Sequence, residues 1–117
     1  MDLTNLDFQQ ARIKQVLFKS RLRSILYGVR ETDDTMFSLQ KNPLGEWLNT
    51  IVKPKYSVHP EVREIERVLQ RMLDTGRELV RRYQSGQLEE ARAGLDQIEG
   101  YSTQITNLLQ TLEKRTG

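Results

Sequence analysis

The sequence predicts an all-α fold, an antiparallel four-helix bundle with three long helices and one short, Pro/Gly-broken helix. Apolar residues recur in alternating steps of three and four along three long segments, and no segment has the two-residue period of a strand. The chain holds only three prolines and seven glycines, so long helices are possible. Its 117 residues, 37% of them hydrophobic, suit a single domain spanning residues 1–117. Short loops between the segments favour antiparallel neighbours.

The first helix is predicted from about Thr4 to about Arg30, with Thr4 or Asn5 as its cap. Its predicted buried seam consists of Phe8, Ala11, Gln15, Phe18, Leu22, Ile25 and Val29. Further apolar residues lie beside or off this seam, namely Leu6, Ile13, Val16, Leu17 and Leu26. A short second helix covers this extra surface poorly, and exposed apolar patches usually mark interfaces. We therefore expect a homodimer whose candidate interface is Leu6, Ile13, Val16 and Leu17.

The second segment, about Met36 to Val52, is predicted to be short and interrupted at Pro43 and Gly45. Beyond the interruption an apolar face resumes with Trp47, Leu48 and Ile51, and residues 53–57 are expected to form a loop. We expect Trp47 to be buried and to anchor this segment against the third helix. The proposed contact is at Gly76, where a missing side chain leaves room for a bulky group.

The third helix is predicted to begin at His59-Pro60-Glu61, because proline is favoured at the first helical position, and to end at residues 85–86. Its apolar stripe comprises Val62, Ile65, Val68, Leu69, Met72, Leu73, Gly76, Leu79, Val80 and Tyr83. The fourth helix is predicted as one element from about Leu88 to about Arg115. Its seam comprises Leu88, Ala91, Leu95, Ile98, Ser102, Ile105, Leu109 and Leu112. Gln15 and Ser102 interrupt their seams, either as register-fixing polar residues, as exposed positions at the end of a seam or, for Gln15, as the remnant of a functional position.

Residues for catalysis are not visible in the sequence. The one histidine, His59, precedes a proline at a helix start and is interpreted as a surface or capping residue. Cysteine is absent, no Gly-rich phosphate loop occurs, and the Glu-x-x-His pairs of di-iron bundles are missing. We therefore predict that the chain is not an enzyme and uses neither a metal nor a cofactor.

Charge and hydropathy limit the kinds of partner and the cellular location that we expect for the chain. Basic residues gather on the first helix at Arg12, Lys14, Lys19, Arg21, Arg23 and Arg30. They form either a solvated face or a surface for an anionic partner, such as an acidic protein or a nucleic acid. Nucleic acid is not the expected partner, because the net charge is only +2. No apolar run approaches the ~18 residues of a membrane span. The first residues do not resemble a signal peptide, and the lack of cysteine suits the cytoplasm, where we expect the protein.

The stretch from Asn42 to Leu48, Asn-Pro-Leu-Gly-Glu-Trp-Leu, resembles the chemoreceptor zinc-binding (CZB) domain of bacterial signalling proteins. That family carries Cys-x-Leu/Phe-Gly-Lys-Trp-Leu at this place. Its first helix has a histidine three residues before an aromatic residue that is followed by lysine. In this chain, Gln15 stands at the histidine position, and Phe18 followed by Lys19 stands at the aromatic and lysine positions. Its third helix has two histidines four residues apart, and by spacing these fall on Leu69 and Leu73.

The resemblance implies a degenerate family member, since all four ligand positions, Gln15, Asn42, Leu69 and Leu73, differ from the family residues. Leucine cannot bind zinc, and neutral amides are poor ligands for it. The motif and pocket residues would be Phe18, Leu44, Gly45 and Trp47. The resemblance also implies a regulatory, protein-binding role in chemotaxis or cyclic-di-GMP signalling and pairing as a dimer. Two alternatives remain: a nucleic-acid-associated bundle using the basic first helix, and a small-ligand sensor using the former metal pocket.

Overall fold

The computed structural model describes residues 3–116, and within them every regular element is a helix. The all-α prediction is therefore confirmed for this part of the chain. The molecule is elongated, with extents of 47 × 21 × 20 Å. The elements in chain order are α1 (Asn5–Leu26), the 3-10 turn η1 (Asp34–Phe37), α2 (Pro43–Trp47), the π-helical turn η2 (Leu48–Val52), α3 (Lys53–Tyr56), α4 (Pro60–Gln84), α5 (Leu88–Ala93) and α6 (Leu95–Thr116).

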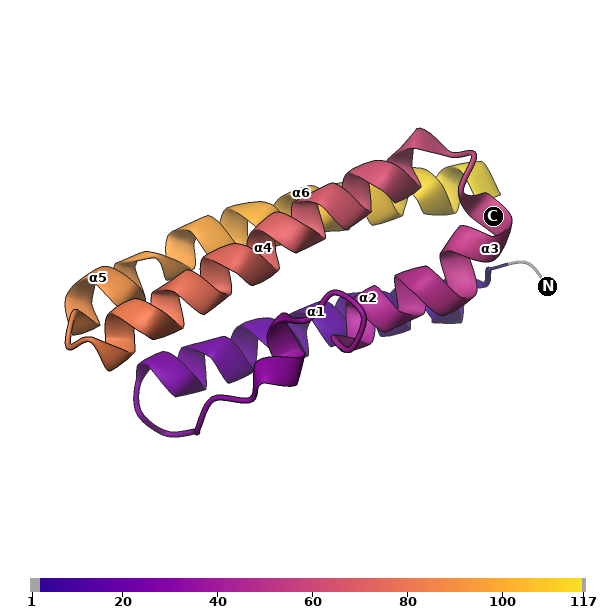
Figure 1. The fold of residues 1–117 in the computed structure, drawn as a ribbon. Helices are drawn as coiled ribbons and strands as arrows, with labels where there is room; N and C mark the ends of the chain where they lie inside the picture. The colour runs from indigo at the N-terminus through magenta and orange to yellow at the C-terminus, as the bar shows by residue number, and fades with distance from the viewer. Residues whose placement is uncertain (1–2, 117) are drawn as a thin grey trace.

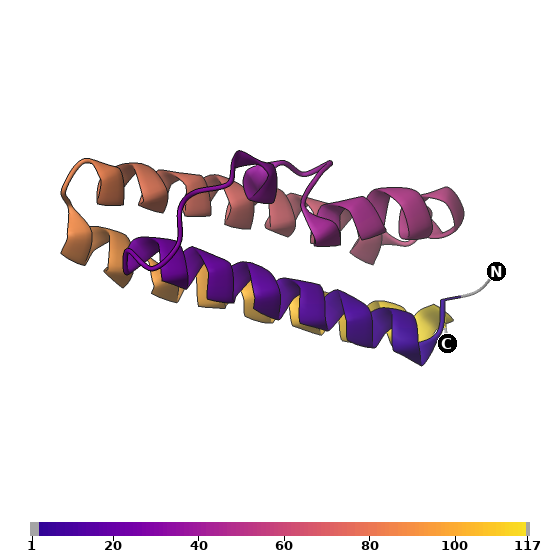
Figure 2. The same cartoon turned by 90° about the horizontal axis from the view of Figure 1, so that it is seen from below.

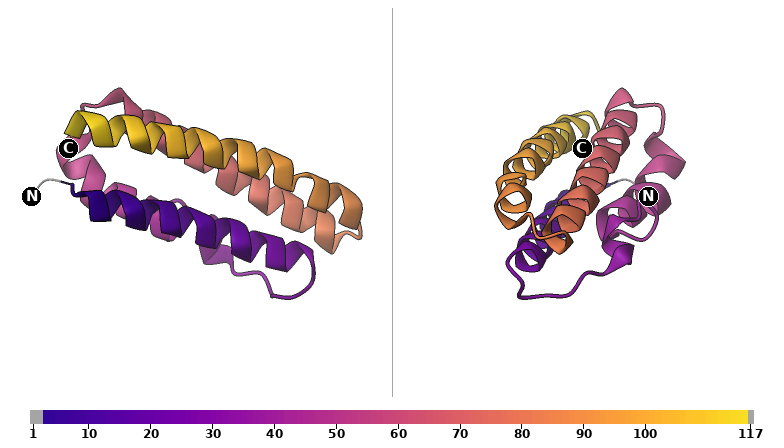
Figure 3. Two further views of the ribbon diagram at one scale, coloured as in Figure 1. Left: turned by 180° about the vertical axis from the view of Figure 1, so that it is seen from behind. Right: turned by 60° about the vertical axis from the view of Figure 1, so that its left-hand side comes forward.

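The long helices lie alongside one another. Helices α4 and α6 lie side by side above α1 and the short elements α2, η2 and α3 (Figure 1). Seen from below, α1 lies along α6 (Figure 2), and the right-hand view of Figure 3 shows the short elements beside α4 and α1. Side-chain hydrogen bonds join α1 to α6 in three pairs: Arg12 with Glu113, Gln15 with Thr106, and Lys19 with Glu99. Because the number on α6 falls as the number on α1 rises, these two helices run in opposite directions.

Helix α1 begins where the sequence predicts. The Asp7 amide donates to Thr4 Oγ1 at 3.2 Å, and the Thr4 amide donates to Asp7 Oδ2 at 2.8 Å. This capping box satisfies donors that the first turn leaves free. The predicted seam from Phe8 to Ile25 is buried.

The end of α1 differs from the prediction. The helix stops at Leu26 rather than near Arg30, because the chain turns away at Gly28, whose φ of 75° suits glycine. Val29, predicted to be on the buried seam, is exposed. Leu26, predicted to lie off the seam, is fully buried, and its carbonyl accepts a 2.8 Å hydrogen bond from Arg92 Nε.

The second segment also differs. Its interruption lies before Pro43, which is the first residue of α2, and Gly45 lies inside this helix. Glycine is required there by the close approach of the Leu39 carbonyl, with which an added Cβ would collide. Helical backbone continues through residues 43–56, so the loop predicted at 53–57 is wrong. The π-helical turn η2 comes just before Pro54, which has no amide to donate to an α-helical bond. Ile51 is half-exposed rather than buried.

Helix α4 agrees with its prediction at both ends. Pro60 lies in its first turn, and it ends at Gln84, before Gly86 with a φ of 89°. The predicted fourth helix is instead two helices, α5 and α6, which meet at Gly94. A Cβ added at Gly94 would collide with the Leu79 side chain, so the junction packs closely on α4. Leu88, expected on the seam, is partly exposed, whereas the α6 seam from Ile98 to Leu112 is buried.

The core around Gly76 corrects one predicted contact. A Cβ added at Gly76 would lie 3.1 Å from Phe37 Cε1 and 3.3 Å from Phe18 Cζ. The space left by the glycine is therefore used by these two rings, and the predicted contact between Trp47 and Gly76 is wrong. Trp47 is itself buried, as predicted, and it meets Phe8 edge-on with ring centroids 6.1 Å apart.

Candidate functional site

Two of the four positions that the resemblance assigns to zinc ligands lie in the hydrophobic core. Leu69 and Leu73 have no exposed surface, as predicted for the α4 stripe. Neither side chain can donate an electron pair to a metal. Both side chains pack α4 against the rest of the hydrophobic core.

Asn42 is also buried, and both the nitrogen and the oxygen of its side-chain amide have hydrogen-bond partners. Its Nδ2 donates to the Met36 carbonyl at 2.8 Å, and its Oδ1 accepts from the amides of Leu44 at 3.0 Å and Gly45 at 3.4 Å. Asn42 thus caps α2 and ties it to the preceding turn η1. Its side chain has a structural function and is not free for a ligand. In the same motif, Leu44 and Gly45 are both buried.

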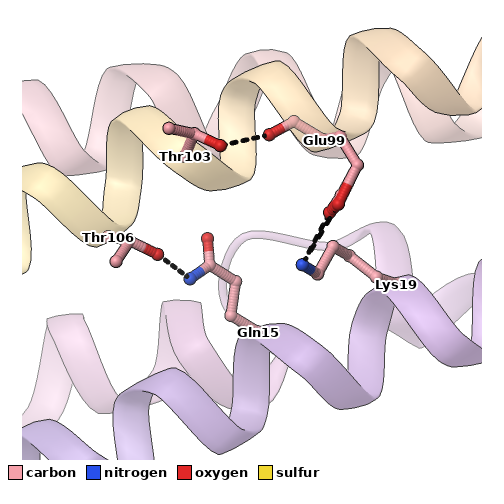
Figure 4. Close-up of polar contacts among 5 residues, drawn as sticks. All are labelled: Gln15, Lys19, Glu99, Thr103 and Thr106. Atoms are coloured by element: carbon pink, nitrogen blue, oxygen red, sulfur yellow. Dashed lines mark hydrogen bonds and ion pairs between the residues drawn. The ribbon is translucent and has the colours of Figure 1, made fainter.

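Gln15 lies inside the contact between α1 and α6 (Figure 4). Its Nε2 donates to Thr106 Oγ1 at 3.1 Å. Its Oε1 is buried without a hydrogen-bond partner among the residues that the structure describes. Ser102, the other predicted polar seam residue, is buried on α6 one turn before Thr106. A buried unpaired amide oxygen costs about 1–3 kcal/mol, so this layer lowers stability while it favours one alignment of the two helices.

Two ion pairs flank the polar layer on the α1–α6 boundary. Lys19 Nζ lies 2.7 Å from Glu99 Oε1 (Figure 4), and Arg12 Nη2 lies 2.8 Å from Glu113 Oε1. All four side chains are partly exposed, so each pair contributes little to stability in water. The two pairs share one antiparallel register of α1 on α6 with the hydrogen bond between Gln15 and Thr106.

The side chains at the four positions that the resemblance assigns to zinc ligands do not fit zinc. Leu69 and Leu73 supply no ligand atom, and the Asn42 amide is already occupied. Within residues 3–116, no group of three or more His, Asp or Glu side chains is placed to hold a metal ion. We therefore assign no metal chemistry to this region.

One face of α1 carries several large apolar side chains in solvent; this outer face is defined here by Leu6, Ile13, Val16 and Leu17. Their exposed fractions are 61%, 58%, 56% and 48%. Leu6, Ile13 and Leu17 follow one another in steps of seven and four, so they form one stripe opposite the buried seam. Val16 lies next to this stripe. All four residues of the predicted interface are therefore solvent-exposed and share a face.

The outer face of α1 continues into a surface groove of about 300 Å³ between α1 and α6. Val16 forms one wall, and the opposite wall comes from the start of α6. The lining residues are Val16, Lys19, Ser20, Arg23, Leu95, Ile98 and Glu99. The apolar surface of α1 is thus extended by a second helix rather than being confined to one.

Cations border this surface. Lys14, Arg21 and Arg23 make no ion pair within 4.0 Å among the residues that the structure describes. The Arg23 guanidinium lies 5.5 Å from the centre of the Tyr27 ring. Hydrogen bonds from Thr35 lower the pKa of Asp33, and the positive charge of Arg21 lowers it further. Helix α1 contains five basic residues and a single acidic one, Asp7.

No family model, no curated protein and no solved structure matches this chain. The resemblance to CZB domains therefore stays a hypothesis, as does the prediction that the chain is not an enzyme. Within residues 3–116, no helix has both the length and the apolar character needed to cross a bilayer.

The sequence reasoning did not identify Thr106, Glu99 or Glu113 as partners of α1. Each lies next to the α6 seam, but a single sequence gives no indication of which residue on a distant helix it will meet. The groove beside Val16 was missed for the same reason.

Proposed function

We propose that the chain is an antiparallel four-helix bundle that acts as a non-catalytic regulatory module, CZB-like but without zinc, in cytoplasmic bacterial signalling. The signalling would be of the chemotaxis or cyclic-di-GMP type. The module contacts other protein chains through the outer face of α1. The exposure of Leu6, Ile13, Val16 and Leu17 on one helix face is the observation that carries this proposal.

Burial of apolar surface stabilises a complex by roughly 25 cal/mol per Å² before the costs of association are subtracted. Large apolar side chains exposed together on one helix face gain nothing from the fold itself and favour contact with another surface. Helix-in-groove recognition uses residues spaced by three, four and seven, which is the spacing seen here.

A second copy of the chain is one partner that fits this proposal. Two-fold dimers are the most frequent solution for such a face, and the CZB resemblance implies pairing. Another protein of the signalling system is the other partner, and the role as an interaction module holds for both.

Light scattering after gel filtration, at micromolar concentration, tests the homodimer. A wild-type mass of twice 13.7 kDa would support the homodimer. The double variant Ile13→Ser/Leu17→Ser should have the mass of one chain. The matched control Val29→Ser/Val58→Ser changes two exposed valines elsewhere and should keep the larger mass. A wild-type mass of 13.7 kDa at all concentrations would exclude the homodimer and leave another protein as the partner.

The basic character of α1 favours one further candidate, a nucleic-acid partner. The apolar outer face weighs against it, because nucleic-acid surfaces are dominated by contacts to phosphates. Binding of a DNA or RNA fragment that falls steeply with salt would support this candidate. No observation favours the small-ligand sensor, since Leu69, Leu73 and Asn42 are all committed to packing or capping.

A further inference from the structure

We infer that the outer face of α1 binds an acidic amphipathic helix of another protein, because its apolar stripe has, along both edges, cations without ion pairs in the described part of the chain. This inference rests on the proposed function, and it adds the chemistry of the partner. The juxtaposition is specific: Lys14 and Arg21 follow one edge of the stripe, and Arg23 follows the other, on the side of the groove.

The charge of α1 is far from that of the rest of the chain. Helix α1 carries five positive side chains and one negative, a formal charge of +4. The whole chain carries only +2, so the remaining residues sum to −2. Arg12 and Lys19 are paired with carboxylates of α6, and this leaves Lys14, Arg21 and Arg23 available to a partner. A partner that covers the stripe brings its own flanking residues next to these three cations.

The shape of the surface suits a helix. The groove between α1 and α6 has an apolar lining from Val16, Leu95 and Ile98, with Arg23 among its lining residues. A partner helix lying along α1 can place one large apolar side chain in this groove and others along Leu6, Ile13 and Leu17. Acidic residues three or four positions away on the partner would then meet the cations.

Three other occupants fit less well. A second copy would bring two helices of charge +4 together, and like charges across an interface oppose association. An anionic lipid surface favours helices with aromatic anchors, and the outer face of α1 has none. A nucleic acid would leave the apolar stripe without a matching surface.

Fluorescence anisotropy with a synthetic peptide tests this inference. The probe is a labelled amphipathic peptide of about 18 residues with leucines three and four positions apart and flanking glutamates. A matched peptide carries lysine in place of each glutamate. We expect the full-length protein to bind the acidic probe at least about tenfold more tightly than the basic one. Raising the salt from about 50 mM to about 500 mM should weaken this binding about tenfold, because partly exposed charges are screened.

The location of the charge is tested by two triple variants with the same change in net charge. Lys14→Gln/Arg21→Gln/Arg23→Gln should weaken binding of the acidic probe about tenfold. Lys41→Gln/Arg63→Gln/Arg71→Gln, at exposed positions outside α1, should leave it unchanged. Circular dichroism checks that both variants fold.

The outcomes separate the two proposals. Equal binding of both peptides, or equal effects of the two triple variants, overturns the inference. Tighter binding of anionic vesicles or a DNA fragment than of the acidic probe overturns it as well. A homodimer whose association is strengthened by salt overturns the inference of an acidic partner, but it keeps the outer face of α1 as an interface. Failure of the acidic probe to bind at about 1 mM, a concentration at which even weak specific complexes form, overturns the inference too. The proposed function fails separately if Ile13→Ser/Leu17→Ser alters neither peptide binding nor oligomeric mass.

Discussion

Helices α1 and α4 have similar apolar inner faces, but their outer faces differ in polarity. Both bury a continuous apolar seam in the core. On α4 no large apolar side chain is exposed, and the outer surface is formed by residues such as Arg63, Arg71 and Glu78. On α1 the corresponding surface carries Leu6, Ile13, Val16 and Leu17.

This difference distinguishes apolar residues that serve folding from those that do not. The seam of α4 accounts for its apolar residues, so α4 needs no partner beyond the fold. Helix α1 has more apolar surface than the fold covers, and this surplus has no role within the isolated chain. Mutations can separate these two uses, because only the first should change the free energy of unfolding.

The largest expected effect is on the buried side of α4. Leu69→Ala should lower the free energy of unfolding by about 2–5 kcal/mol, because it removes buried methyl groups and leaves a cavity. Urea denaturation followed by circular dichroism measures the change. The control is Leu6→Ala on the outer face of α1, which should change stability by less than about 0.5 kcal/mol. Equal losses in both variants would contradict the division between the two faces.

Much of the fold could be predicted, because helical periodicity records burial on each helix separately. The seams of α4 and α6, and that of α1 through Ile25, follow from spacing alone. Spacing does not show where a helix ends when tertiary contacts decide it. Helix α1 stops short of Val29 because the chain turns at Gly28, and the helix after α4 breaks at Gly94 where it meets Leu79.

The exposure of the candidate interface could be anticipated from its place off the seam, but its surroundings could not. The groove beside Val16 depends on how α6 lies against α1. Proline at position 54 predicts a loop, whereas the helical backbone continues past it after a π-helical turn. The partner of Gly76 was assigned to Trp47 by size, yet Phe18 and Phe37 were equally suitable by that criterion.

A smaller effect is expected at the cap of α2. Asn42→Ala should lower the free energy of unfolding by about 1–2 kcal/mol, because the amides of Leu44 and Gly45 lose their acceptor. Asn42→Asp keeps the acceptor but removes the donor to the Met36 carbonyl and buries a negative charge beside it, so it should also lower the free energy of unfolding. Thermal melts give the order of the variants. An Asn42→Ala protein as stable as the wild type would show that the cap is dispensable.

The smallest effect, and the only gain, is expected at Gln15. Gln15→Leu removes a buried oxygen without a described partner and should raise the free energy of unfolding by about 1 kcal/mol, despite the lost bond to Thr106. Gln15→Glu, which buries a charge at the same place, should be destabilising. Urea denaturation measures both. A loss of stability in Gln15→Leu would mean that the polar layer between α1 and α6 supports the fold more than it costs.

The most direct test of the central claim measures folding and binding in one variant, Ile13→Ser/Leu17→Ser. If the outer face of α1 serves association, the free energy of unfolding of the single chain stays within about 0.5 kcal/mol of wild type. Association, measured as binding of the acidic peptide or as oligomeric mass, is lost in the same preparation. A fall in the free energy of unfolding above about 1 kcal/mol, with association unchanged, would show that these residues belong to the fold and not to an interface.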